Sequence, residues 1–179
     1  MKRLKQLSRL TAVAATLTLL AGCFGMVGGG ASNRPFGEIT RLQNMPPPTT
    51  GSLPNPVKGK TFSDTWSAAR SNGRRHEGVD IFAKKGTPVR STTYGIVTKI
   101  GENRLGGKVV GIQGAGAWHY YAHLSRFADI KLYQSVQAGQ IIGYVGDTGN
   151  AKGTAPHLHY GVYLRNGAIN PYPLVNPYR

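Results

Sequence analysis

Two histidines separated by one leucine constrain this chain more than any other stretch of its sequence. His157, Leu158 and His159 alternate between polar and apolar types inside the run 156–160, and such alternation predicts a β-strand. Side chains two residues apart on a strand share one face, so the two imidazoles would lie about 7 Å apart, with Leu158 on the opposite face. A fold that contains this strand must either leave both imidazoles in solvent or bring other polar groups to them.

A histidine and an aspartate lie four residues apart farther upstream, at His76 and Asp80. Together with a histidine of the downstream strand, they would give a metal ion three protein ligands. Three protein ligands leave the fourth position of a tetrahedral zinc ion open to water, which is the arrangement of a catalytic rather than a structural zinc site. Zinc lowers the pKa of that water to about 7 and polarises a carbonyl group. Surface histidines without a metal remain the alternative on this pattern alone.

Three blocks of residues extend the pattern along most of the chain. In chain order they are His76–Asp80 with the turn Gly86–Val89, then Tyr121–Leu124, and then Gly146–Asn150 leading to His157–His159. The blocks and their order resemble the lysostaphin/LytM-type zinc metallopeptidases, which cut the peptide part of bacterial cell walls. The resemblance runs from about Val57 to Leu174 and implies that the chain is an enzyme, a peptidoglycan endopeptidase.

The resemblance assigns roles to five side chains. His76, Asp80 and His159 would bind one Zn²⁺ per domain. His123 and His157 would be catalytic, because they would stand over the open side of the metal, orient its water, move a proton and stabilise the oxyanion. Which of these two histidines acts as general base is left open.

The stretch 118–124 holds a second candidate histidine. Strand alternation places His119, Tyr121 and His123 on one face, and the block shared with the family selects His123. His119 is then expected near solvent or at the rim of the groove. Tyr121 is expected either to line the substrate groove or to pack structurally. Glu77 is not expected to be the general base, because it would face away from its neighbours on a strand and the pattern is not the helical HExxH.

Short β-prone segments separated by glycine turns predict the fold. They read as a series of hairpins, which favours a mostly β domain: a compact antiparallel sheet or sandwich, barrel-like, with little helix outside the leader. The 123 residues from 57 to 179 suit one domain with one core. We expect this metallopeptidase domain to be a monomer.

The first 22 residues have the form of a secretory leader. Basic residues precede an apolar run from Leu10 to Leu20 and then small residues, and the run is too short for a comfortable transmembrane helix. Cys23 follows the leader, and 20–23 resembles the lipobox of bacterial lipoproteins, in which the cysteine is lipidated. An ordinary cleaved leader with an incidental cysteine is the alternative. In Gram-negative lipoproteins, an aspartate directly after the cysteine commonly causes retention in the inner membrane. This chain has Phe24 there, which points to a place at the outer membrane, facing the periplasm.

Residues 23–56 are predicted to be a tether behind the lipid anchor. Runs of glycine and proline and few apolar residues favour an extended, flexible chain. Leu42 and Met45 could nevertheless dock on the domain.

The formal charge of the chain is +15, and it is +11 without the four basic residues of the leader. A basic surface favours polyanions. We expect an anionic cell-wall polymer rather than nucleic acid, because the sequence has no recognition motif for nucleic acid and the leader exports the chain.

The predicted function is a zinc-dependent endopeptidase that hydrolyses peptide cross-links of peptidoglycan. The cross-link would join D-alanine to a diamino acid, or be a glycine bridge. The alternative is a non-catalytic wall-binding regulator that activates another hydrolase; such proteins often lack ligand positions, whereas this chain keeps all five. Tethering and regulatory protein partners are two ways in which the enzyme could be restrained.

Overall fold

The computed structural model describes residues 34–176. The leader, Cys23 and the start of the predicted tether lie outside the described residues. The helices are α1 (Arg34–Gln43) and three short 3-10 turns, η1 (Ser71–Gly73), η2 (Gly149–Ala151) and η3 (Tyr172–Leu174). The strands are β1 (Leu53–Pro54), β2 (Val79–Phe82), β3 (Pro88–Arg90), β4 (Gly95–Asn103), β5 (Gly107–Gln113), β6 (Trp118–Leu124), β7 (Arg126–Phe127), β8 (Ser135–Val136), β9 (Ile141–Tyr144), β10 (His157–Leu164), β11 (Gly167–Ile169) and β12 (Val175–Asn176).

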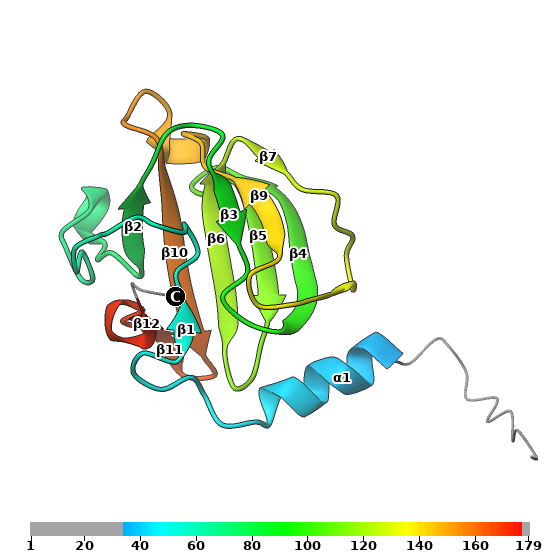
Figure 1. Ribbon diagram of the computed structural model, residues 1–179. Helices are drawn as coiled ribbons and strands as arrows, with labels where there is room; N and C mark the ends of the chain where they lie inside the picture. The colour runs from blue at the N-terminus through cyan, green and yellow to red at the C-terminus, as the bar shows by residue number, and fades with distance from the viewer. Residues whose placement is uncertain (1–33, 177–179) are drawn as a thin grey trace, which may run out of the picture. The chain divides into compact units, whose positions relative to one another are not determined.

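A large antiparallel sheet forms the centre of the fold (Figure 1). Its strands follow the order β11-β10-β6-β5-β4-β8, and β2 also pairs with β10. A smaller antiparallel sheet, β3-β9-β7, lies in front of it in Figure 1. Apolar side chains from both sheets form one core, among them Val89, Val110, Ile112, Ile142 and Leu158. The prediction of a mostly antiparallel β domain with little helix is therefore confirmed.

The two faces of the large sheet have different chemistry. On β10, Leu158 and Tyr160 are fully buried in the core, so alternation directs His159 to the other face. His159 lies opposite Asp80 of β2 on one side and opposite Ala122 of β6 on the other. The strand register thus brings together two segments that are far apart in the sequence.

A bulge in β6 changes the face on which His123 lies. Val110 of β5 pairs with Tyr121, but Lys108 pairs with Leu124, so β6 has one more residue than β5 between these pairs. His123 has a φ of +62°, a left-handed conformation that is uncommon for a residue other than glycine. The bulge moves His123 to the same face as His159, as bulges near active sites often re-aim a side chain.

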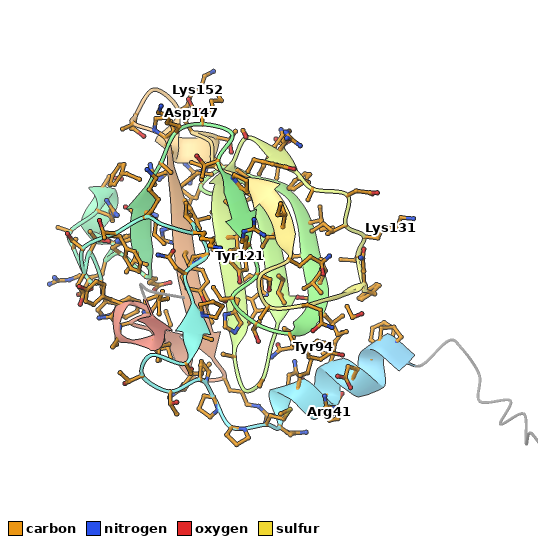
Figure 2. All side chains as sticks on the ribbon, viewed as in Figure 1. Arg41, Tyr94, Tyr121, Lys131, Asp147 and Lys152 are labelled. Carbon is orange, nitrogen blue, oxygen red and sulfur yellow. The ribbon has the colours of Figure 1, made fainter. Side chains whose placement is uncertain are left out.

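Of the two alternatives for Tyr121, structural packing is the one observed, and the expectation for His119 is wrong, because the bulge interrupts the alternation. Tyr121 does not line the groove: it is fully buried, and its hydroxyl group accepts a hydrogen bond from the Thr92 amide at 2.9 Å (Figure 2). His119 is not near solvent either, because only 1% of it is exposed. It lies beside Tyr160, with 2.8 Å between its Nδ1 and the Tyr160 hydroxyl group. The groove face instead receives Tyr120.

The described part of the predicted tether is folded onto the domain. Leu42 of α1 is 1% exposed, and its carbonyl group accepts a hydrogen bond from Gly116 at 2.8 Å. Farther along, Leu53 is buried and β1 pairs with β12 in parallel. These few apolar residues and backbone pairings order the segment 34–56 despite its glycines and prolines. None of the helices in the described part of the chain is long and apolar enough to cross a membrane.

Candidate active site

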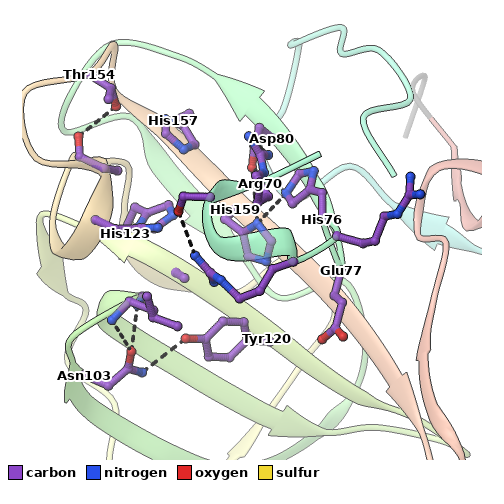
Figure 3. A pocket seen from close by; sticks show the side chains of 18 of the residues that line it. Arg70, His76, Glu77, Asp80, Asn103, Tyr120, His123, Thr154, His157 and His159 are labelled. Carbon is purple, nitrogen blue, oxygen red and sulfur yellow. Dashed lines mark hydrogen bonds and ion pairs between the residues drawn. The ribbon is translucent and has the colours of Figure 1, made fainter. Parts of the chain in front are cut away.

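A groove of about 870 Å³ crosses the outer face of the large sheet (Figure 3). Its floor comes from β4, β6 and β10, and its walls come from the segment before β2 and the loops after β4 and β9. All five residues that the family resemblance selects line this groove: His76, Asp80, His123, His157 and His159.

Three of these residues bring ligand atoms to one point. The Nε2 atom of His76 lies 2.9 Å from Nδ1 of His159 and 3.1 Å from Oδ1 of Asp80. The same Oδ1 lies 3.2 Å from Nδ1 of His159. Metal–ligand bonds of 2.0–2.2 Å in a tetrahedral zinc site hold the ligand atoms roughly 3.3 Å apart. The triangle therefore has the size and the donor types of one face of a tetrahedral zinc site.

Neighbouring groups fix the orientation of each ligand. The Thr65 carbonyl group lies 2.8 Å from Nδ1 of His76, so Nδ1–H donates to it and the Nε2 lone pair is free for a metal. The Arg70 guanidinium donates to Oδ2 of Asp80 and leaves Oδ1 in the triangle. Gly78 makes room for His159, because a Cβ at that position would lie 2.7 Å from its Cε1 atom.

The protonation states match what a cation requires. Burial acts against ionisation of Asp80, but the contacts of its carboxyl group with the His159 and His76 imidazoles outweigh it and hold its pKa well below its usual range. Burial also lowers the pKa of His159, although the Asp80 carboxylate opposes this. A neutral imidazole and an ionised carboxylate are the forms that bind a metal.

The other two histidines form a pair beside the triangle. The rings of His123 and His157 lie 4.9 Å apart, and the His123 ring lies 5.9 Å from that of His159. Nδ1 of His123 lies 2.9 Å from the Thr148 carbonyl oxygen, and Nδ1 of His157 lies 2.8 Å from that of Ala155. Both Nδ1–H groups are therefore donors, which leaves both Nε2 atoms able to accept a proton.

Burial is the main reason that the pKa of His123 falls to about 4. A histidine with this pKa is neutral at pH 7 and can act as a proton acceptor. The loop after β4 holds it in place, because the His123 amide donates to the Gly106 carbonyl group at 2.7 Å.

Neither strand alternation nor the family blocks predicted two residues of the groove, Tyr120 and Arg70. Tyr120 lies on the groove floor with its ring 6.1 Å from that of His159, and Asn103 donates to its hydroxyl group at 3.2 Å. No pattern reveals a bulge, so the alternation that includes His123 points to Tyr121 and not to Tyr120. Arg70 belongs to a visibly basic loop, but only the fold brings it to Asp80. Glu77 lines the groove as well and is exposed.

Comparison with known proteins gives one consistent result. The family described as Peptidase family M23 matches residues 74–171. The chain is 46% identical over 136 residues to an L-Ala–D-Glu endopeptidase of Bacillus subtilis, a match that covers 68% of this chain and 42% of the relative. It is 42% identical over 111 residues to lysostaphin of Staphylococcus simulans, covering 58% of this chain and 22% of lysostaphin. The chain thus spans less than half the length of these relatives.

Solved structures show the same likeness. The catalytic domain of lysostaphin from Staphylococcus simulans is 32% identical with a TM-score of 0.58, over 64% of this chain and 90% of that one. Csd3 of Helicobacter pylori is 38% identical with a TM-score of 0.59, over 70% of this chain and 33% of that one.

Proposed function

The chain belongs to peptidase family M23, a family of peptidoglycan endopeptidases, and from this premise we propose that it is a zinc-dependent enzyme that hydrolyses peptide bonds of bacterial peptidoglycan. The observation that carries the proposal is the triangle of His76, Asp80 and His159 beside the pair His123 and His157. All five groups are held by neighbouring atoms, as a catalytic site requires.

The residues divide the work of hydrolysis between them. His76, Asp80 and His159 would hold the zinc ion, which supplies Lewis acidity and lowers the pKa of a coordinated water molecule. His123 or His157 accepts the proton of the water that attacks the peptide carbonyl group, through its free Nε2 atom. The imidazolium ion formed in this way stabilises the charge that develops on the carbonyl oxygen and then returns the proton to the leaving amine.

The names of the relatives give different peptide bonds as the one that is cut. The names of the relatives include an L-Ala–D-Glu endopeptidase, a DD-carboxypeptidase/endopeptidase and a glycyl-glycine endopeptidase. For a lipid-anchored protein of the periplasm we propose peptide cross-links between D-alanine and a diamino acid, with L-Ala–D-Glu as the alternative. Mass spectrometry of the muropeptides released from purified walls distinguishes these bonds by the new termini.

A non-catalytic regulator of another wall hydrolase is the second candidate. Purified protein should contain about one zinc ion per chain and should reduce the turbidity of a wall suspension. Zinc content near zero, with no release of muropeptides near neutral pH, would favour the regulator. We further propose that Cys23 carries a lipid and that the domain faces the periplasm from the outer membrane.

A further inference from the structure

The groove continues past His159 onto three aromatic side chains that the proposed chemistry does not use. Trp118 and Tyr120 lie on β6, and Tyr163 lies on β10; all three line the groove. The ring centroid of Trp118 is 5.4 Å from that of Tyr120 and 5.7 Å from that of Tyr163, and the two tyrosine rings are 6.4 Å apart. We call this set the aromatic floor.

Two glycines make space for the aromatic floor. A Cβ at Gly111 of β5 would lie 2.3 Å from Cζ2 of Trp118, and a Cβ at Gly161 would lie 2.9 Å from Cε2 of Tyr163. The indole therefore crosses β5 at Gly111, and its Nε1–H donates to Thr98 of β4 at 2.9 Å. These contacts fix the rings before any ligand arrives, so a ligand need not order them.

The backbone beneath the aromatic floor is already fully engaged in pairing. β6 pairs with β5 on one side and with β10 on the other. A peptide strand that binds by adding to a sheet needs an edge with free N–H and C=O groups, and β6 has none. The aromatic floor therefore suits a ligand that stacks on its rings rather than a peptide strand that pairs with the backbone.

Polar groups surround the rings. Lys99 and Glu77 line the same stretch of groove, and Tyr120 and Tyr163 each carry a hydroxyl group. Burial, with the nearby negative charge of Glu77, raises the pKa of Tyr163 to about 12, so this hydroxyl group keeps its proton and can donate. Aromatic faces with a polar rim suit a ligand that has an apolar face and a hydrogen-bonding edge. A pyranose ring has both, in its C–H face and its hydroxyl and acetamido groups.

We propose that Trp118, Tyr120 and Tyr163 form a subsite for an N-acetylated hexosamine ring of the glycan strand. The inference rests on the proposed function and adds to it that the sugar attached to the cleaved peptide is recognised. Ala122 lies opposite His159, and Tyr120 and Trp118 are two and four strand residues beyond it, about 7 and 13 Å away. That distance equals two to four extended residues, so a sugar can reach the floor while its stem peptide lies at the triangle.

The proposal is tested by the ratio of the kcat/KM values of two substrates. One is a stem-peptide substrate that carries its disaccharide, and the other is the same peptide without sugar. We expect the wild-type protein to prefer the first in kcat/KM, and Trp118→Ala to lower this preference about five- to tenfold, as the loss of one aromatic contact allows. Trp66→Phe is the matched control, because Trp66 does not line the groove, and it should keep the preference. An unchanged preference in both Trp118→Ala and Tyr163→Ala, with folding verified by circular dichroism, would overturn the proposal.

A binding measurement does not depend on catalysis. The chain has two tryptophans, so in Trp66→Phe the remaining tryptophan fluorescence comes from Trp118. Titration with a trimer of N-acetylglucosamine should change this fluorescence saturably, and Tyr163→Ala should weaken binding severalfold. If neither substrate is cleaved but the trimer binds, the proposed function fails and the subsite stands. If both substrates are cleaved and the trimer does not bind at millimolar concentration, the subsite fails and the peptidase stands.

Discussion

At the scale of single residues, the five groups of the site differ in how their atoms are engaged. His76 and His159 direct one ring nitrogen each into the triangle with Asp80. His123 and His157 instead donate Nδ1–H to carbonyl groups and lie beside the triangle. The geometry therefore separates the proposed ligands from the proposed proton carriers, which is a division that the spacing of histidines in the sequence does not provide.

This division predicts different losses on substitution. Asp80→Ala or His159→Ala removes a ligand and should leave the protein without zinc. His157→Ala and His123→Ala should keep zinc but lose at least about a hundredfold in rate, which is the usual scale for a positioned acid–base group. Zinc content by atomic emission and wall lysis, measured on the same preparations, test this. Loss of zinc in His157→Ala with retention in His159→Ala would reverse the assignment of the pair.

Arg70 should act on the metal through Asp80. Its guanidinium occupies Oδ2 and so keeps the carboxylate as a one-oxygen ligand. Arg70→Ala should weaken zinc binding about 10- to 100-fold, the usual cost of removing a group that orients a ligand. Arg74→Ala is the matched control, because Arg74 donates to Ser71 at 3.4 Å and not to a ligand. Chelator competition gives both affinities, and equal affinities in the two variants would contradict this role.

At the scale of elements, β6 shows what could be predicted and what could not. The strand 118–124 follows from alternation and turn residues, and the structure has β6 at the same bounds. Beyond Tyr121, the face of the sheet on which each side chain lies could not be predicted, because the one extra residue in the bulge reverses the alternation. The docking of Leu42 was expected as a possibility and is observed, but helix α1 was not predicted, since a single buried leucine gives a weak signal among glycines and prolines.

The buried face of β6 predicts a specific sensitivity to acid. Burial lowers the pKa of His119 to about 3, below its value near 6.5 in an unfolded chain. The unfolded state therefore binds a proton that the native state does not, and His119 costs stability as the pH falls from about 6.5 toward 3, at about 1.4 kcal/mol per pH unit. His119→Gln should be less stable at pH 7, because the hydrogen bonds among His119, Thr92 and Tyr160 are disturbed.

Between pH 6 and pH 4, His119→Gln should lose less stability than the wild-type protein. Urea unfolding of the zinc-free proteins at several pH values measures the difference in slope. Parallel curves would show that His119 does not carry this acid sensitivity. Asp80 does not interfere in that window, because its lowered pKa makes its contribution disappear only below the ordinary carboxyl range.

At the scale of the whole molecule, the described part of the chain begins close in sequence to the proposed anchor. The first described helix starts at Arg34, so residues 24–33 separate it from Cys23. Ten residues span at most about 36 Å when fully extended. This is a shorter reach than a free tether of the full segment 23–56 would allow, and it would confine the groove to the wall nearest the membrane.

The anchor itself gives the prediction for the whole chain. Each buried methylene of an acyl chain contributes about 0.8 kcal/mol to membrane binding, and stable anchoring takes more than one chain. Because Cys23 is the proposed site of the lipid, Cys23→Ser should abolish labelling with a tagged fatty acid and leave an unprocessed precursor. A variant with its leader replaced by an ordinary cleavable one should fractionate with the soluble periplasmic proteins. Its purified domain should bind zinc and cut walls at the wild-type rate, because the side chains proposed for zinc binding and catalysis belong to residues 76–159. Fatty-acid labelling that persists in Cys23→Ser would refute lipidation at this cysteine.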